Sequence, residues 1–275
     1  MDLREQLEVA LPRFLRRCDA TSTRLAYKRE LVRFLAWLPS EPSEELLFDY
    51  RDHLRARDLG PTTVRWRTTV VRSFVEFAQR RKYVDHELAG DFKPPKGKSG
   101  FAPRVLTKAE LERLIAAPDR RTRRGKRDAL VLVLLGVGGL RASEVCGLNV
   151  EDVTIQSDRV IVHVLGKGKK ERLVPVPSYQ DLVQGYLDSW PEARGQAALI
   201  LGGHRGREAK RLTLAGLDYL VRQQADAAEI VGISAHSLRH TAASLAVENG
   251  EPLHRLRDRL GHSSIIVTSR YLHVE

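Results

Sequence analysis

Residues 159–176 read RVIVHVLGKGKKERLVPV, two β-rich stretches separated by a glycine-containing turn. Valine and isoleucine favour strands and glycine permits a tight turn, so the pattern predicts a β-hairpin of residues 159–165 and 171–176. Helical patterns lie on both sides of it, including an apolar helix at residues 128–138 and helices from about Leu212 onward. We therefore predict a mostly α-helical fold with a small β-sheet, of the α+β class.

The N-terminal part of the chain is patterned as a bundle of helices with short breaks. Apolar residues recur at helical spacing in two segments: Leu25, Leu31, Phe34 and Leu38 in residues 23–38, and Trp66, Val70, Phe74 and Phe77 in residues 61–79. The spacing predicts that each segment turns these side chains toward a common core.

A stretch rich in proline, glycine and lysine, DFKPPKGKSGFAP, follows this bundle at residues 91–103. It has no apolar period and is typical of an exposed linker. We predict a helical domain at residues 1–91, a basic linker at 92–104 and a second domain at 105–275.

The composition points to an intracellular protein with a polyanionic partner. The formal net charge is +11, and an excess of this size attracts polyanions such as nucleic acid through long-range fields and counterion release; a merely basic soluble protein is the alternative. No apolar run approaches the length of a membrane span, and the start of the chain lacks a signal-peptide pattern. The two cysteines, Cys18 and Cys146, are too few for a disulfide framework. We expect a cytoplasmic location and no membrane contact.

Two groups of residues are candidates for DNA contacts. Arginines crowd residues 120–127, where they form either a phosphate-binding strap or an ordinary solvated loop. The helix expected from Pro61 has polar and basic residues near its start, which could face DNA or plain solvent. The candidates are Thr62, Thr63, Arg65, Arg67, Arg72, Arg121, Arg123 and Arg124.

The segment HSLRH at residues 236–240 places His236, Arg239 and His240 on one side of a helix. Three nitrogen donors on one face can hold an anion. A structural capping cluster and a metal-binding histidine pair are the alternatives, and the metal-binding alternative lacks the intervening glutamate and a further ligand.

Three further fragments carry side chains that could do chemistry. Arg141 follows a glycine-rich turn in GGLRASE, Lys167 lies on the hairpin turn, and His262 follows Leu260-Gly261 shortly before Tyr271. The glycines match neither a dinucleotide-binding fingerprint nor a Walker motif. Taken singly, Lys167 reads as a turn lysine, His262 as a helix-start histidine and Tyr271 as a packing residue.

In this order, GLRxSE, GKGxKER, HxLRH, LGH and a tyrosine nine residues later, the fragments resemble the tyrosine recombinase or phage integrase family, Xer-type members above all. The resemblance covers residues 105–271, and the N-terminal helices are similar to the family's core-binding domain. It implies a catalytic C-terminal domain with the catalytic residues Arg141, Lys167, His236, Arg239, His262 and Tyr271. Glu144 and His240 then orient the arginines, or are ordinary helix-surface residues.

The resemblance also implies a reaction. Two arginines would stabilise charge on the phosphate oxygens, His236 is the candidate base for Tyr271, His262 would donate to a phosphate oxygen, and Lys167 would protonate the leaving oxygen. The product would be a 3′-phosphotyrosine bond and a free 5′-hydroxyl. No acidic cluster accompanies the motifs, so we expect no metal and no other cofactor.

The expected partners are double-stranded DNA and further copies of the chain, as a tetramer on two DNA sites. Family members often pass a C-terminal helix to a neighbour, and only residues 272–275 follow Tyr271, so this route of subunit coupling is left open. The sequence identifies no accessory protein and no target site. Two other activities compete: DNA relaxation of the type IB topoisomerase kind, and DNA binding by a catalytically silent accessory protein.

Overall fold

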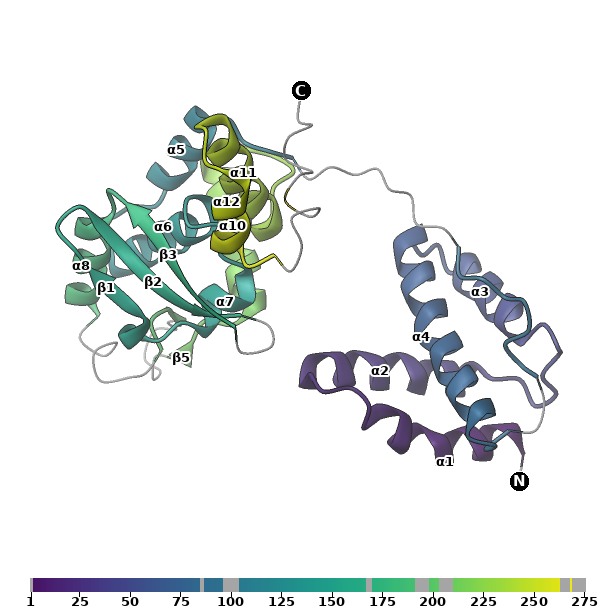
Figure 1. Cartoon of the computed structure of the whole chain (residues 1–275). Helices are drawn as coiled ribbons and strands as arrows, with labels where there is room; N and C mark the ends of the chain where they lie inside the picture. Colours follow the sequence, from purple (N-terminus) through teal and green to yellow (C-terminus); the bar gives the residue numbers. More distant parts are fainter. Residues whose placement is uncertain are drawn as a thin grey trace. The chain divides into compact units, whose positions relative to one another are not determined.

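The structure is a computed structural model that describes residues 2–84, 87–95, 104–166, 170–190, 198–202, 210–262 and 268 (Figure 1). The chain divides into two compact units, Met1–Phe101 and Ala102–Glu275, called here the N-terminal and the C-terminal unit. Within the described ranges, no helix combines the length and apolar character that a membrane crossing requires. The predicted fold class, mostly helical with a small sheet, is confirmed.

Helices make up the N-terminal unit: α1 (Leu3–Leu15), α2 (Thr21–Trp37), α3 (Leu46–Ala56) and α4 (Pro61–Arg80). Local sequence sets their starts. Asp2 caps α1 in a capping box with Glu5, and Pro61 occupies the first turn of α4, where its missing N–H costs nothing. The helices enclose one apolar core, which extends to Phe92 at the start of the predicted linker.

Two of the expected core positions in this unit are wrong. Leu25 is 62% exposed and Trp66 is 40% exposed. Leu25 lies six residues before Leu31, about 240° around the helix, so it points away from the face formed by Leu31 and Phe34. Trp66 lies at the rim of its apolar face, where its ring meets the ring of Tyr27 edge-on.

The C-terminal unit combines helices with two small sheets. Its helices are α5 (Lys108–Ala116), α6 (Arg123–Gly136), α7 (Ala142–Gly147), α8 (Gln180–Ser189), α10 (Leu214–Ala227), α11 (Ala235–Glu248) and α12 (Leu253–Leu260), with a 3-10 turn at Val150–Asp152. Its strands are β1 (Val153–Ile155), β2 (Arg159–Leu165), β3 (Glu171–Pro177), β4 (Leu201–Gly202) and β5 (Lys210–Arg211).

The larger sheet has the order β1-β2-β3 and is antiparallel throughout. Strands β2 and β3 pair in the predicted hairpin, with Val162 opposite Val174 and Leu165 opposite Glu171. Valines at alternate positions of both strands are buried, because side chains on a strand alternate between the two faces of a sheet. The turn residues 167–169 lie outside the described residues.

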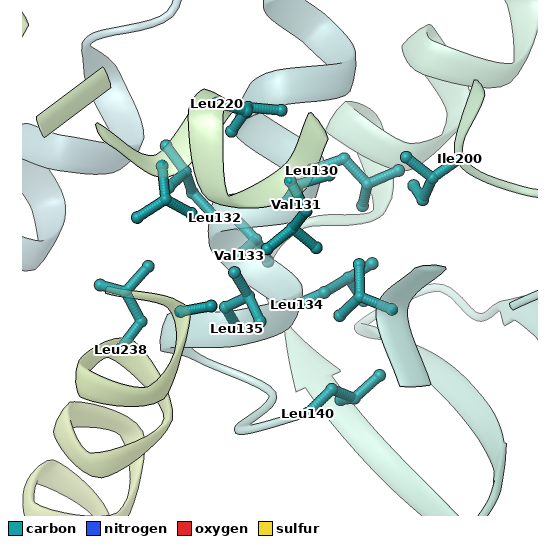
Figure 2. Close-up of a cluster of buried hydrophobic side chains, with 14 of the residues drawn as sticks. Leu130, Val131, Leu132, Val133, Leu134, Leu135, Leu140, Ile200, Leu220 and Leu238 are labelled. Carbon is teal, nitrogen blue, oxygen red and sulfur yellow. The ribbon is translucent and has the colours of Figure 1, made fainter. Parts of the chain in front are cut away.

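Helix α6 is the centre of the C-terminal unit. Every residue from Arg127 to Gly136 is buried, and Figure 2 shows its apolar side chains meeting Leu220 of α10 and Leu238 of α11. The helix was predicted at residues 128–138 but begins at Arg123 and ends at Gly136. It begins earlier because the Thr122 hydroxyl accepts from the N–H of Gly125 and caps the first turn.

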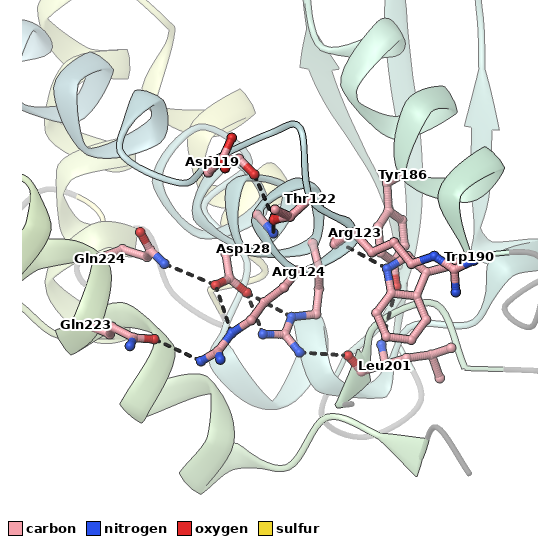
Figure 3. Close-up of polar contacts among 12 residues, drawn as sticks. Asp119, Thr122, Arg123, Arg124, Asp128, Tyr186, Trp190, Leu201, Gln223 and Gln224 are labelled. Atoms are coloured by element: carbon pink, nitrogen blue, oxygen red, sulfur yellow. Dashed lines mark hydrogen bonds and ion pairs between the residues drawn. The ribbon is translucent and has the colours of Figure 1, made fainter. Parts of the chain in front are cut away.

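A buried ion pair fixes the first turns of α6. The guanidinium of Arg127 lies 2.6 Å from a carboxylate oxygen of Asp128 and also donates to the carbonyl of Leu201 at 3.1 Å. The amide of Gln224 donates to the other oxygen of Asp128 at 3.0 Å (Figure 3). These bonds join α6 to β4 and α10.

Candidate active site

The turn after α6 places Arg141 at the surface of the C-terminal unit. Gly139 has φ +70°, and a Cβ at this position would lie 2.8 Å from Cδ2 of Leu260, so only glycine fits. The chain then extends, and Arg141 becomes the N-cap of α7. The glycine-rich turn therefore sends the Arg141 side chain out of the core, as the sequence indicated.

Glu144 on α7 holds Arg141 in two ways. One carboxylate oxygen accepts the backbone N–H of Arg141 at 2.8 Å, and the other accepts from its guanidinium at 2.7 Å. The same carboxylate receives both terminal nitrogens of Arg172 on β3, at 3.0 and 2.7 Å. A buried carboxylate held by two guanidinium groups is well compensated, and removing one partner would be costly.

The charge state of Glu144 follows from these contacts. Its side chain is only 6% exposed, and burial by itself would raise the pKa of the carboxyl. The hydrogen bonds from Arg172 and from the backbone N–H of Arg141 outweigh burial and hold the pKa below its usual value. Glu144 is therefore ionised at neutral pH.

Arg239 lies on α11 and is almost completely buried. Its guanidinium donates to the carbonyl of Gly139 at 2.7 Å and to the carbonyl of Leu260 at 2.6 Å. Its ion-pair distance to Glu144 is 3.9 Å. Arg239 thus joins the turn before Arg141 to the end of α12.

Three consecutive carbonyl groups at the end of α12 accept from three different arginines. Arg172 donates to the carbonyl of Arg259 at 2.7 Å, Arg239 to that of Leu260, and Arg141 to that of Gly261 at 3.0 Å. The last carbonyls of a helix have no partner within the helix and carry partial negative charge, so cations are favoured there. The arginines are thereby gathered around one helix end.

Three histidines lie close to this cluster. His236 and His240 are one turn apart on α11, with 2.9 Å between their Nε2 atoms. His262 follows Gly261, whose φ of +67° ends α12 in a left-handed cap. The Nδ1 atom of His262 lies 3.0 Å from the hydroxyl of Thr268.

Burial and positive neighbours keep these histidines neutral. Burial, followed by the charge of Arg239, lowers the pKa of His236. Burial and the neighbouring His236 lower the pKa of His240 to about 4. Burial and the charges of Arg239 and Arg141 lower the pKa of His262 to about 4. A neutral imidazole can accept a proton, which a general base requires.

We expect the C-terminal unit to lose stability as the pH falls from 6.5 toward 4. In the unfolded chain His240 and His262 protonate near 6.5, whereas in the folded protein they stay neutral down to about 4. In this window the unfolded state binds more protons, so protonation favours unfolding, and above pH 6.5 the full stability is present. Thermal unfolding measured from pH 7.5 to 4.5 would show a falling melting temperature.

The control for this pH dependence is a protein with both His240→Gln and His262→Gln. Glutamine does not titrate, so its melting temperature should fall less steeply over the same range. An equally steep fall in the two proteins would contradict the assignment to these histidines.

The structure brings most of the predicted catalytic residues together. The contacts above connect Arg141, Arg239 and Glu144 around the end of α12, with His236, His240 and His262 beside them. Lys167 and Tyr271 lie outside the described residues, so this arginine–histidine cluster is described without them.

Sequence reasoning missed Arg172. The sequence did contain a pointer to this residue, because Arg172 is the last residue of the GKGKKER stretch, which forms part of the motif order. A strand pattern alone marks it as one more polar residue on β3.

The DNA-contact candidates on α4 fall into two groups. Thr62, Thr63 and Arg65 are exposed in its first turns. Arg67 and Arg72 are half-buried beside acidic residues: Arg67 lies 3.5 Å from the buried Glu30, and Arg72 lies 2.7 Å from Glu76.

The candidates beside α6 also have local partners. Arg121 pairs with Asp119, and Arg124 donates to Gln223 at 2.9 Å. The backbone carbonyl of the exposed Arg123 accepts from the indole of Trp190 (Figure 3). These arginines lie at the start of α6, whereas Arg141 follows its end, about 20 Å away along the helix. The structure does not bring them to the arginine–histidine cluster at the end of α12.

Other chemistries have little support in the described part of the chain. Burial, followed by the nearby Asp218, raises the pKa of the Cys146 thiol to about 11, so it is not a thiolate. Among the described residues, no group of three His, Cys, Asp or Glu side chains is arranged to hold a metal ion.

Comparison with known proteins identifies the family. The sequence profile of the phage integrase family matches residues 104–275. Tyrosine recombinase XerC of Corynebacterium efficiens is 33% identical over 263 residues, which covers 94% of this chain and 82% of that protein.

Solved structures share the fold. The site-specific recombinase XerH bound to its difH substrate in a pre-cleavage complex has a TM-score of 0.72 at 20% identity, covering 98% of this chain and 82% of that chain. A lambda integrase tetramer bound to a Holliday junction has a TM-score of 0.74 at 17% identity, covering 98% and 77%. The resemblance that the motifs indicated is thereby confirmed: this chain belongs to the phage integrase family and is a tyrosine recombinase, of the class of enzymes that break and rejoin DNA.

Proposed function

We propose that this chain exchanges strands between two DNA sites by cutting and rejoining them through a covalent bond to Tyr271. The observation that carries the proposal is the gathering of Arg141, Arg239 and His262 at the end of α12, from three segments that are far apart in the sequence. A concentration of guanidinium groups beside neutral imidazoles suits a phosphodiester, which is an anion and gains charge during attack.

Arg141 and Arg239 bind the nonbridging oxygens of the scissile phosphate. Negative charge grows on these oxygens when the nucleophile attacks, and fixed donors stabilise it more in the transition state than in the ground state. Glu144 and the carbonyls at the end of α12 hold the guanidinium groups before DNA arrives, so little reorganisation is needed.

The protons move between the tyrosine, a histidine and the hairpin lysine. The hydroxyl of Tyr271 gives its proton to neutral His236 and attacks phosphorus, while His262 donates a hydrogen bond to a phosphate oxygen. The bond from phosphorus to the 5′-oxygen breaks, and Lys167 protonates that oxygen. The products are a 3′-phosphotyrosine ester and a free 5′-hydroxyl, and reversal by another 5′-hydroxyl rejoins the strand.

We base the proposed DNA binding and assembly of this chain on those of its relatives. XerH is bound to difH, and lambda integrase forms a tetramer on a Holliday junction. We infer that this chain likewise binds double-stranded DNA in the cytoplasm as a tetramer on two sites, with residues 1–91 as a core-binding domain, 92–104 as linker and 105–275 as the catalytic domain. The exposed Thr62, Thr63 and Arg65 are the α4 residues that we expect to contact phosphates, together with the exposed Arg123. Four other candidates would first have to leave their local partners: Arg67, Arg72, Arg121 and Arg124.

Trapping on a nicked suicide substrate tests the proposal. The substrate carries a candidate recombination site, found by capture on DNA of the source genome, and a nick that lets the short 5′-hydroxyl fragment diffuse away. We expect an adduct that survives SDS and that forms in EDTA as well as in Mg²⁺, because the arginines supply the positive charge. Absence of any adduct on substrates that the protein binds would contradict the proposal.

A further inference from the structure

Arg172 on β3 has the most complete set of contacts around Glu144. Its two terminal nitrogens donate to the two carboxylate oxygens at 3.0 and 2.7 Å, and its Nε donates to the carbonyl of Arg259 at 2.7 Å. The side chain is 10% exposed. All three nitrogens of one guanidinium are therefore engaged.

These contacts join three segments of the C-terminal unit. Arg172 lies at the start of β3, Glu144 lies in α7 and holds Arg141, and Arg259 lies in the last turn of α12, which leads to His262. Packing fits the same arrangement, because a Cβ added to Gly261 would come within 3.0 Å of Nη1 of Arg172. The guanidinium thus lies directly against the turn that carries His262.

We propose that Arg172 is a positioning residue for strand cleavage, acting through Glu144 on Arg141 and through the end of α12 on His262. The inference rests on the proposed function. The guanidinium of Arg172 is needed for its shape as well as for its charge, because the planar group donates to a carboxylate and to a carbonyl at the same time. A lysine ammonium at the end of a flexible chain keeps the charge but cannot reproduce this set of directions.

The first test is Arg172→Lys, with Arg159→Lys as the matched control. Arg159 lies on the neighbouring strand β2 and is paired with the exposed Asp158. DNA affinity and single-turnover cleavage of the suicide substrate at saturating protein are measured below the melting transition of all the proteins. We expect Arg172→Lys to cleave roughly 10–100-fold more slowly with unchanged DNA affinity, as loss of an outer partner of a reactive group typically does. Arg159→Lys should cleave at the wild-type rate.

The second test is the double variant with Glu144→Gln. Because Arg172 acts partly through Glu144, the two effects are not additive, and the double variant should cleave faster than the product of the two single effects predicts. Loss of folded protein would instead lower the active fraction in a burst titration and leave the rate of the active molecules unchanged.

The outcomes separate the inference from the function on which it rests. If the wild-type protein forms no adduct, the proposed function fails. If it cleaves and Arg172→Lys cleaves equally fast, only the positioning role is overturned. If the double variant shows the product of the two single effects, the action of Arg172 through Glu144 is overturned.

Discussion

Replacing Tyr271 by phenylalanine is expected to abolish the covalent protein–DNA adduct while leaving DNA affinity unchanged. The change removes one oxygen atom, and that oxygen is the atom that would form the bond to phosphorus. A phenol has an ordinary pKa of about 10, so at neutral pH it depends on a nearby base or on positive charge to become a nucleophile. The proposed site would supply both, in neutral His236 and in the arginines around the end of α12.

The measurement is adduct formation on the suicide substrate, read after SDS denaturation, together with a binding titration. Tyr219→Phe is the matched control, because Tyr219 lies on α10 of the same unit and is 61% exposed. That variant should form adduct at the wild-type rate. Adduct formed by the Tyr271→Phe protein would show that another side chain is the nucleophile.

A change of Arg239 to lysine is expected to slow cleavage by about 10²–10³-fold, the usual effect of removing one donor to a developing oxyanion. Arg239 donates to the carbonyls of Gly139 and Leu260 at the same time. Lysine keeps the charge, but its single ammonium group cannot donate to two carbonyls and a phosphate at once, as the planar guanidinium of arginine can. One buried carbonyl would lose its partner, at a cost of about 1–3 kcal/mol in the free energy of unfolding.

Single-turnover cleavage and urea unfolding measure these two effects separately. Arg222→Lys is the control, since Arg222 is exposed on α10 and its guanidinium donates to the carbonyl of Asp218 on the same helix. It should change neither quantity. Wild-type cleavage by Arg239→Lys would exclude Arg239 from phosphate binding.

The sequence predicted an element correctly where one short, contiguous stretch contained all the information needed. Alternating valines and a glycine turn predicted the hairpin of β2 and β3, and the structure pairs the two strands from Arg159 and Pro177 to Leu165 and Glu171. The boundaries of α6 and the burial of Leu25 were predicted wrongly. The cap at Thr122 is a feature that an apolar period does not report, whereas the six-residue step from Leu25 to Leu31 does not fit the helical period and places Leu25 on another face.

The chain order of Arg141, Lys167, the HSLRH segment, His262 and Tyr271 was enough to identify the family and its class of enzyme, which breaks and rejoins DNA. These motifs are contiguous in sequence, and their spacing along the chain can be read without coordinates. The fold class could be read in the same way, because periodicity records which face of each segment is buried.

The contacts within the arginine–histidine cluster depend on the folded chain and could not be predicted from the sequence. Glu144 bonds to Arg172, 28 residues away, and Arg239 bonds to the carbonyl of Gly139, 100 residues away. No local pattern encodes which buried carboxylate or helix end a distant guanidinium will reach, because that depends on how β3, α7, α11 and α12 pack. For the same reason the sequence showed Arg172 only as a strand residue, whereas packing places its guanidinium between Glu144 of α7 and the end of α12.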